Sequence, residues 1–348
     1  MKTAAIICEL NPLHTGHKKL IDYTRTIADR IICIMSGNFT QRGLPACADK
    51  YSRAKHAVLA GADLVVELPT IYATAAAENF ALGGVKIANK LNADILVFGS
   101  ECGDIDKLNE CARMLDDVNI NKQIVVALAN GVSYPKAVSL ATDSDVFDKP
   151  NNVLAIEYIR AIRKTKSSII PITVKREDNY NGAPEQFASS SSLRNDKSIR
   201  GTYTYDFVIA DINDKIEEKY CELTPAVIAL YGKEDLRRIE GVTEGLENRI
   251  YNADKNHGYE AMMESIKTKR YTRLKLQRII LNALLSVTKE DVNESRISEP
   301  CVKVLAVKSD SVTMLSGIEN LSDNITDKAD RLYYALSGKE APARLVKV

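Results

Sequence analysis

The chain has 348 residues, more than one typical small domain needs, which predicts two domains or a large α/β domain with an appended helical one. Hydrophobic residues make up 45% and charged residues 27%, as in an ordinary soluble protein, and no apolar run is long enough to predict a signal peptide or a membrane span. The net charge of +1 excludes neither RNA nor a small acidic substrate, because only a local basic face steers such ligands.

The first expected element is a buried strand at Thr3–Cys8, a short apolar run rich in β-branched residues. Asn11-Pro12 then predicts a turn, because proline biases the residue before it away from the helical region. A helix is expected to follow directly. His14 and His17 therefore lie where a parallel strand passes into a helix.

This position suits a nucleotide phosphate. The unpaired N–H groups at a helix N-terminus attract phosphate, and two imidazoles add further donors. Gly16 lets a nucleotide approach the backbone, and Lys18 adds a fixed charge. These residues predict ATP binding, with His14, His17 and Lys18 in catalysis. A metal-binding pair or two ordinary surface histidines is the alternative interpretation.

The first half of the chain alternates strands and helices, which predicts parallel βαβ units. Further strands are expected at residues 30–35, 63–68, 94–98 and 169–174. Helices are expected at residues 17–28, 50–60, 73–90 and 154–164. Right-handed crossovers would place the carboxyl ends of all these strands at one edge, where open α/β sheets bind ligands.

Polar, glycine-bearing or cationic segments follow three of these strands, at residues 36–43, 99–101 and 175–176. They are expected at the same edge as the two histidines. Gly37 and Gly99 taken singly are equally consistent with tight turns, but together the segments favour a pocket.

Two later segments also offer nucleotide contacts. Asn151 and Asn152 lie beside a proline at a helix start, although a helix N-cap is the stronger interpretation by residue type. The serine run at residues 189–192, followed by Arg194, predicts a helix start whose hydroxyl and N–H groups face a phosphate. A flexible linker is the alternative for this run.

After about residue 205 the strand signal fades, which predicts a nucleotide-binding domain over residues 1–205 and a mainly helical one over 206–348. Residues 267–278 are densely basic, and apolar residues at helical spacing predict that one face of the following helix packs. A solvated helix face is the usual explanation of such a charge run, and contact with an RNA backbone is the sharper one. A late β-hairpin is expected from strands at 301–307 and 311–315.

The seven cysteines lack the short paired spacings of zinc sites and disulfide frameworks. We therefore expect reduced thiols in a cytoplasmic protein.

Neither a membrane partner nor a DNA partner is expected.

Eight motifs occur in a characteristic order. They are Glu9-Leu10-Asn11-Pro12-Leu13-His14-Thr15-Gly16-His17, Met35-Ser36-Gly37-Asn38-Phe39, Gln41-Arg42-Gly43, Phe98-Gly99-Ser100-Glu101, Pro150-Asn151-Asn152, Val174-Lys175-Arg176, Tyr271-Thr272-Arg273 and Leu276-Gln277-Arg278. Together they resemble the motifs of the bacterial tRNA(Met) cytidine acetate ligases, over nearly the whole chain. The pattern His-x-Gly-His alone indicates only the nucleotidyltransferase superfamily.

The chain departs from the family pattern at a few places. Aromatic residues usually stand at the positions of Leu10 and Leu13, and a Tyr-His pair often stands where this chain has Tyr180-Asn181. Position 181 is therefore left without an assigned role. The helical tail is compact for the family, which concerns tRNA docking more than the chemistry.

The resemblance implies a Rossmann-like nucleotidyltransferase domain with a parallel sheet, followed by a mainly helical tRNA-binding domain. It also implies that acetate attacks the α-phosphate of ATP to give acetyl-adenylate and pyrophosphate. The N4 amine of the wobble cytidine of elongator tRNA(Met) then takes the acetyl group. Imidazole donors and cations would lower the barrier by stabilising charge on the phosphates. Mg²⁺ is expected to arrive with ATP, since no carboxylate cluster predicts a dedicated metal site.

The resemblance also assigns residues to these roles. The implied ATP-binding residues are Ile7, Cys8, Glu9, Asn11, Pro12, Gly16, Gly99, Asn151, Asn152, Arg176, Ser189, Ser191 and Arg194. Arg270, Arg273 and Arg278 are expected to contact tRNA. Lys50 and Arg53, with Lys55, form the alternative docking surface.

Two other functions stay open from the sequence. A cofactor-biosynthesis nucleotidyltransferase would use the same histidine pocket without needing a basic helical domain. A non-catalytic RNA-binding protein with a degenerate nucleotide pocket is the other, and the retention of both histidines with Gly16 and the serine run argues against it.

Overall fold

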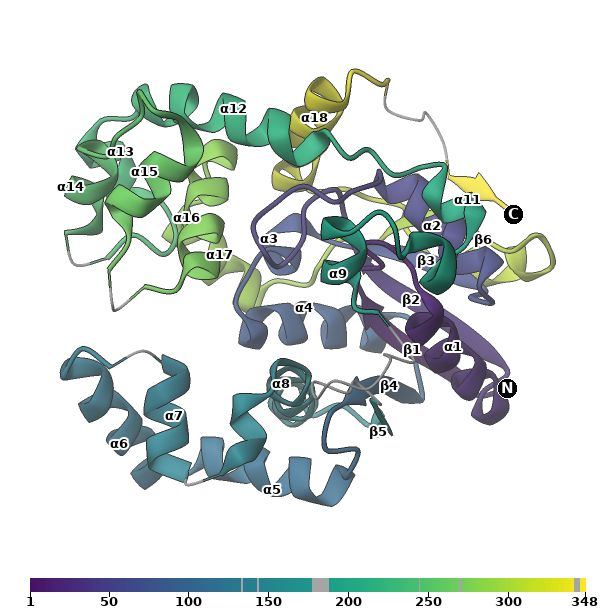
Figure 1. The fold of residues 1–348 in the computed structure, drawn as a ribbon. Coiled ribbons are helices and arrows are strands. Elements are labelled where there is room, and N and C mark those ends of the chain that lie inside the picture. The colour runs from purple at the N-terminus through teal and green to yellow at the C-terminus, as the bar shows by residue number, and fades with distance from the viewer. Residues whose placement is uncertain (133, 143, 177–187, 244, 269–270, 341–344) are drawn as a thin grey trace.

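A seven-stranded sheet forms the centre of the computed structural model, which describes residues 1–132, 134–142, 144–176, 188–243, 245–268, 271–340 and 345–348 (Figure 1). The strand order is β5-β4-β1-β2-β3-β6-β7. The strands are β1 Thr3–Cys8, β2 Arg30–Ser36, β3 Leu64–Leu68, β4 Ile95–Ser100, β5 Ile170–Lys175, β6 Lys303–Val307 and β7 Val346–Lys347. The first five are mutually parallel, β6 is antiparallel to β3, and β7 is parallel to β6. The expected α/β class and its five parallel strands are confirmed, each strand within two residues.

The central strands are apolar along their whole length because both faces of the sheet are covered. In β1, Ala4, Ile6 and Cys8 join the hydrophobic cluster on one face, whereas Ala5 and Ile7 join the cluster on the other. This two-sided burial explains why the strand shows no alternation of polar and apolar residues in the sequence.

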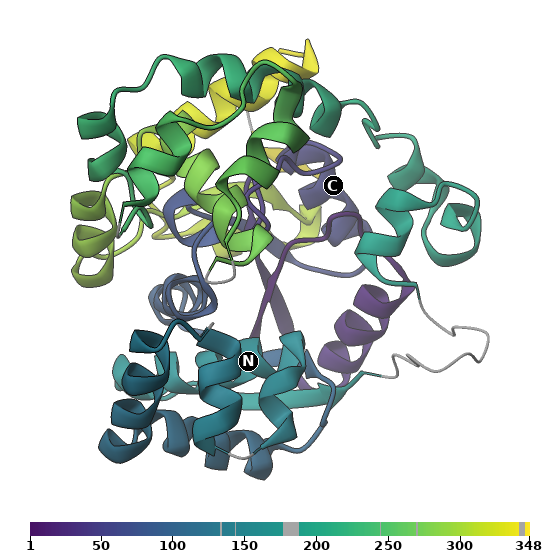
Figure 2. The same cartoon turned by 60° about the vertical axis from the view of Figure 1, so that its left-hand side comes forward.

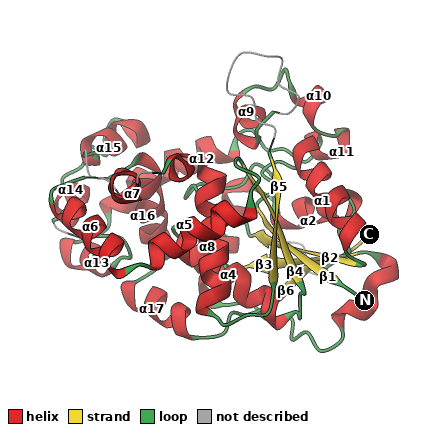
Figure 3. Cartoon of the chain, turned by 90° about the horizontal axis from the view of Figure 1, so that it is seen from below, coloured by secondary structure: helices red, strands yellow, loops and turns green. Residues whose placement is uncertain are grey.

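Helices cover the two faces separately (Figure 3). One face carries α1 Thr15–Ile27, α2 Lys50–Leu59 and α11 Asp206–Ile209. The other carries α3 Thr70–Ala73, α4 Ala77–Lys90, α5 Ile105–Asp116 and α8 Pro150–Lys164, with α6 Val118–Ala129, α7 Tyr134–Thr142 and the 3-10 helix η1 Asp145–Asp148 packed beyond them. The opposite placement of α1 and α8 makes the gap between β1 and β4 a topological switch point, where such sheets bind ligands.

The part of the chain after β5 is mainly helical, as expected. Its remaining helices are α9 Ser190–Asn195, α10 Arg200–Tyr203, α12 Ile216–Ala229, α13 Lys233–Arg238, α14 Leu246–Tyr251, α15 Gly258–Ile266, α16 Arg273–Leu285, α17 Lys289–Ile297, η2 Ser309–Leu315 and α18 Asn324–Ser337. Figures 1 and 2 show α12–α17 and the α5–α7 group on either side of α4. The helical part has its own hydrophobic core, which also takes in Phe39 and Leu44 from the loop between β2 and α2. In the described ranges, no helix is long and apolar enough to cross a membrane.

The expected late β-hairpin is wrong in its second half. The strand β6 forms, but it pairs with β3 and β7, and the following Ser309–Leu315 is a 3-10 helix. The apolar run of β6 extends the buried sheet, whereas the Ser-Asp-Ser segment after it favours a turn. Because β6 and β7 belong to the sheet, residue 205 does not separate the sheet from the C-terminal part.

The helix expected at residues 73–90 begins later than expected, at Ala77, and a separate short helix precedes it. α3 ends at Ala73 and α4 begins at Ala77. Between them the Thr74 hydroxyl donates to the carbonyl of Thr70 at 2.8 Å, a side-chain bond that competes with helix continuation.

Candidate functional site

His14 and His17 cap the start of α1 with reciprocal hydrogen bonds. Nδ1 of His14 accepts from the N–H of Gly16 at 3.1 Å, and Nδ1 of His17 accepts from the N–H of His14 at 3.2 Å. The two ring centroids are 3.8 Å apart. Because Nδ1 is an acceptor in each ring, a neutral imidazole must carry its proton on Nε2. In each neutral ring the hydrogen is therefore on Nε2, at the end of β1.

The environment keeps His17 neutral. Its pKa is held well below the ordinary value of 6.5, chiefly by burial and further by His14 and Arg176. His14 is buried, and His17 is half-buried. His17 can thus donate a hydrogen bond at neutral pH without acting as a cation.

Gly99 and Arg176 lie at the ends of β4 and β5, beside these histidines. A Cβ at Gly99 would stand 3.1 Å from Cγ of Arg176, so the arginine side chain lies directly over the glycine. The backbone N–H of Arg176 donates to the carbonyl of Ser100 at 2.8 Å. Its charge also lowers the pKa of His17, which places the guanidinium within electrostatic range of the histidine pair. The structure therefore brings together the residues expected after β1, β4 and β5.

Asn151 and Asn152 lie at the start of α8 and bond chiefly to the loop after β4. The Glu101 carboxylate accepts from both backbone N–H groups, at 3.2 and 2.7 Å, and from Nδ2 of Asn151 at 2.8 Å. The Asn152 amide accepts from the N–H of Cys102 and donates to the carbonyl of Val146. Neither asparagine is the N-cap, a position that Lys149 takes. Their expected contact with ATP stays a prediction.

The serine run is a helix start, which rules out the linker alternative. The Ser189 hydroxyl accepts from the N–H of Ser192 at 3.1 Å as the N-cap of α9. The Ser190 hydroxyl donates to the carbonyl of Pro12 at 3.2 Å, and the guanidinium of Arg194 donates to the carbonyl of Asn11. These bonds hold α9 against the loop between β1 and α1.

Arg42 contacts the serine run, although the sequence assigned it no role of its own. Its Nη1 donates to the Ser191 hydroxyl at 3.2 Å, while its buried Nε has no partner in the described part of the chain. The preceding N–H, of Gln41, donates to the Glu9 carboxylate at 2.7 Å. Burial raises the pKa of Glu9, against the lowering effect of Arg194, Arg53 and Arg42. The sequence signals for Arg42 are its place in the polar segment after β2 and in the Gln41-Arg42-Gly43 motif.

Several expected ATP contacts have their side chains turned to other partners. Ile7 packs into the core under α4. The thiol of Cys8 interacts with Cys33, and the pKa of Cys8 is raised by that contact and by burial. The Asn11 amide accepts from the N–H of Cys47 at 2.8 Å. Nucleotide contacts from this stretch are therefore expected from the backbone.

Lys18 is not part of the histidine cluster in the structure. Its Nζ forms an ion pair with Asp22 one turn further along α1, and its side chain is 37% exposed. An i,i+4 pair on the helix surface accounts for this lysine. The expected catalytic role is therefore not supported by its position.

Lys50 and Arg53 are wrong as an RNA-docking surface, because both are completely buried. Nζ of Lys50 bonds Glu67 at 2.7 Å and Asp330 at 2.5 Å. Arg53 donates to four backbone carbonyls, those of Glu9, Ser36, Gly37 and Ala48. Full pairing is what allows such cations inside a protein, and it removes them from contact with RNA.

The basic stretch before and within α16 is divided between surface and interior. Arg273 is exposed and pairs with Glu260 at 2.6 Å. Arg278 lies mostly buried, with its pKa lowered by burial, and donates to the carbonyl of Gln41 at 3.4 Å. A Cβ at Gly43, where φ is +75°, would meet the backbone N of Arg278 at 2.6 Å, so this loop packs directly on α16. Arg270 lies outside the described residues, as does Asn181.

The parallel sheet, its switch point and the histidine pair at the start of α1 define a nucleotidyltransferase-type enzyme. A family model described as HIGH Nucleotidyl Transferase matches residues 1–334. A protein of Acetivibrio thermocellus named tRNA(Met) cytidine acetate ligase is 37% identical over 359 residues, covering 92% of this chain and 86% of the relative. A protein of the same name from Thermoanaerobacter sp. is 37% identical, and the match covers 84% of this chain and 80% of that relative. The chain therefore belongs to the HIGH nucleotidyl transferase family and, more narrowly, to the tRNA(Met) cytidine acetate ligases.

A solved structure supports this placement. Thermotoga maritima TmcAL bound with alpha-thio ATP matches with a TM-score of 0.87 and 25% sequence identity, covering all of both chains. The apo form of TmcAL matches with a TM-score of 0.82 and 27% identity. The names of the curated relatives make this chain an enzyme, which excludes the non-catalytic RNA-binding alternative.

Proposed function

We propose that this protein is an ATP-dependent ligase that activates acetate as acetyl-adenylate and acetylates the N4 amine of the wobble cytidine of elongator tRNA(Met). The names of its relatives and the nucleotide in the TmcAL structure support this proposal. The observation that carries it is the paired histidines at the start of α1, with His17 held neutral, at the same sheet edge as Gly99 and Arg176.

In the first proposed step, an oxygen of acetate bonds to the α-phosphorus of ATP while the bond to pyrophosphate breaks. Negative charge then develops on the α-phosphate and on the leaving group. The Nε2–H donors of His14 and His17 and the cation of Arg176 stabilise that charge. Neutral imidazoles suit this role, because a hydrogen-bond donor is needed rather than a proton transfer.

In the second proposed step, the cytidine N4 amine attacks the acyl carbon and AMP departs with one acetate oxygen. The helical part would hold the tRNA, with Arg273 on the exposed side of α16 contacting a backbone phosphate. Reaching the active site requires the base to be turned out of its stack, and contacts to the flanking backbone support that state.

Mg²⁺ is proposed to enter with the phosphates of ATP. The described residues contain no group of three or more His, Cys, Asp or Glu side chains that could hold a metal ion. Mg²⁺ bound through substrate phosphates and water needs no such cage. The proposal also keeps the protein in the cytoplasm, where ATP and tRNA are available.

An omission experiment tests the proposed function. The protein is mixed with ATP, acetate and tRNA(Met), and each component is left out in turn while pyrophosphate and N4-acetylcytidine are measured. Acetylcytidine should require all three components, and pyrophosphate release should require both ATP and acetate. Acetylation that proceeds without ATP, or pyrophosphate release that ignores acetate, would overturn the proposal.

A further inference from the structure

Tyr158 on α8 is a largely buried tyrosine whose hydroxyl forms no hydrogen bond with another residue of the described ranges. The residue is 5% exposed, and its ring lies 5.4 Å from the ring of Phe98, centroid to centroid. The hydroxyl oxygen is not one of the enclosed side-chain atoms without a partner among the described residues, so it is open to water. By contrast, the hydroxyl of Tyr72 donates to the carbonyl of Ser295 at 2.6 Å, and that of Tyr333 donates to Ala46 at 3.0 Å. A ligand group that reaches this hydroxyl can therefore take the place of water as its hydrogen-bond partner.

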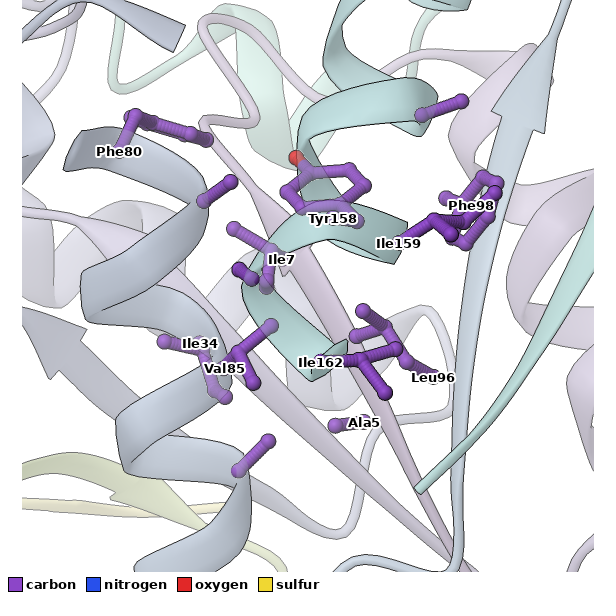
Figure 4. Close-up of a cluster of buried hydrophobic side chains, with 14 of the residues drawn as sticks. Ala5, Ile7, Ile34, Phe80, Val85, Leu96, Phe98, Tyr158, Ile159 and Ile162 are labelled. Carbon is purple, nitrogen blue, oxygen red and sulfur yellow. The ribbon is translucent and has the colours of Figure 1, made fainter. Parts of the chain in front are cut away.

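The hydroxyl points to the ligand-binding edge of the sheet. Figure 4 shows the Tyr158 oxygen at the end of the cluster toward which the arrow of β4 points, with Phe98 and Ile7 beside the ring. The pKa of Tyr158 is raised, chiefly by burial and further by Cys8 and Glu9, which lie at the end of β1. Asn151 precedes Tyr158 by seven residues and so lies on the same face of α8.

Other unpaired tyrosine hydroxyls in the described chain differ in their surroundings. Those of Tyr220, Tyr259 and Tyr334 are enclosed, and all three residues belong to the core of the helical part, away from the parallel strands. Tyr158 belongs instead to the cluster between the sheet, α4 and α8. Of these four tyrosines, only Tyr158 lies at the switch point of the parallel sheet.

Tyr158 approaches this edge from the face of the sheet opposite to the histidine pair. α1 packs on one face and α8 on the other, as the membership of the two hydrophobic clusters and Figure 3 show. In a phosphoryl or nucleotidyl displacement, the attacking and leaving oxygens lie roughly in line on opposite sides of phosphorus. If α1 and α9 hold the departing pyrophosphate, the attacking group arrives from the α8 side.

We propose that Tyr158 forms the acetate subsite, where its hydroxyl donates a hydrogen bond to the attacking carboxylate and Phe98 contacts the methyl group. This assignment rests on the proposed function. The acetate oxygen bonds to the α-phosphorus, the bond to the pyrophosphate oxygen breaks, and that oxygen keeps the electron pair. Tyr158 retains its proton throughout and then donates to the acyl oxygen of the adenylate. The raised pKa keeps the phenol protonated for this purpose.

The variant Tyr158→Phe tests the assignment, because it removes the hydroxyl and keeps the ring. We expect the KM for acetate in pyrophosphate release to rise about tenfold or more, the scale of a hydrogen bond to a charged group. ATP binding measured by calorimetry and the melting temperature should stay at the parent values. Tyr72→Phe is the matched control: it should lower the melting temperature and leave the KM for acetate unchanged.

The outcomes separate this assignment from the function on which it rests. A parent KM for acetate in Tyr158→Phe would overturn the acetate subsite while the proposed function stands. If the variant binds ATP more weakly while its KM for acetate is unchanged, the hydroxyl contacts the nucleotide instead. That result would also overturn the acetate subsite. A parent protein without acetate-dependent pyrophosphate release would overturn the proposed function and this assignment together.

Discussion

The two hydrogen bonds that cap α1 decide how the histidines can act. Each occupies Nδ1 of one ring, so in each neutral imidazole the hydrogen is on Nε2, the donor that the proposed function uses. Alanine at either position would remove the cap and the donor together. Asparagine would keep an acceptor near the position of Nδ1 and remove only the Nε2–H donor. The structural and catalytic contributions can therefore be measured separately.

We predict that His14→Asn and His17→Asn each lower turnover about a hundredfold or more, the usual scale of a lost transition-state donor. Their melting temperatures should stay close to that of the parent. The alanine variants should lose turnover equally and also lose about 1 kcal/mol of stability with the cap. Steady-state kinetics and thermal unfolding measure both effects. Near-parent turnover in either asparagine variant would falsify the donor role.

The low pKa of His17 has a consequence for stability against pH. Between that low pKa and the ordinary value of 6.5, the unfolded chain binds a proton at this ring and the folded chain does not. Lowering the pH through this range therefore removes stability from the parent, a contribution that His17→Asn lacks. As the pH falls below 6.5, we expect the free energy of unfolding to decrease more in the parent than in the variant. Urea titrations from pH 7.5 to pH 5 check this, and a constant difference would contradict it.

The sequence predicts the position of a side chain along the sheet edge better than its exposure. His14, Gly99 and Arg176 are brought together because the ends of parallel strands share an edge, which the pattern of strands already indicates. Lys50 is misassigned because its partner Asp330 lies 280 residues away. The contact of Arg42 with Ser191 spans 149 residues, so nothing local could reveal it.

At the scale of elements, a buried cluster of charged side chains, Lys50, Glu67 and Asp330, connects α18 to the start of α2. Lys50 bonds both Glu67 on β3 and Asp330 on α18, and Nδ2 of Asn38 also donates to Asp330. The pKa of Glu67 is raised to about 7, chiefly by burial. Removing the lysine would leave two carboxylates facing each other in the interior.

We predict that Lys50→Met lowers the free energy of unfolding by about 3–5 kcal/mol, the scale for breaking a buried ion pair. Adding Glu67→Gln should recover part of the loss, because one uncompensated charge is removed. Lys308→Met, which breaks an exposed pair with Asp310, is the control and should change stability by about 0.5 kcal/mol or less. Urea unfolding measures all three. A loss below about 1 kcal/mol in Lys50→Met would argue against the burial of this lysine.

Elements with strong local patterns are predictable, and those defined by distant partners are not. The β-branched runs of β1 to β5 can be recognised from the sequence, because a short apolar run flanked by turns is typical of a buried strand. β6 is also visible in the sequence, but its partner β3 lies more than 230 residues earlier, which local turn signals cannot indicate. The expected hairpin fails for this reason.

At the scale of the whole molecule, the helical part is packed firmly on the nucleotide-binding part. Nζ of Lys86 on α4 donates to the carbonyls of Ser295, Arg296 and Ser298 at the end of α17. Gly43 packs on the backbone of Arg278 in α16. These contacts keep the proposed tRNA surface at a set position relative to the histidine pair.

We predict that Arg273→Glu weakens tRNA binding and lowers the slope of log affinity against log salt by about one, as expected for one lost phosphate contact. ATP binding should not change. Arg278 is unsuitable for this test because it is mostly buried against Gln41. Lys308→Glu, on the loop after β6, is the control and should bind tRNA like the parent. If Arg273→Glu keeps the parent affinity and slope, the docking surface lies elsewhere.

The most direct test of the central claim follows an oxygen atom. The protein is supplied with ATP, tRNA(Met) and acetate carrying ¹⁸O in both carboxylate positions, and the nucleotide product is analysed by mass spectrometry. Attack of acetate on the α-phosphorus, followed by loss of AMP from the acyl carbon, predicts AMP with one ¹⁸O and one pyrophosphate for each acetylcytidine formed. ADP with labelled inorganic phosphate, or unlabelled AMP, would contradict activation through acetyl-adenylate.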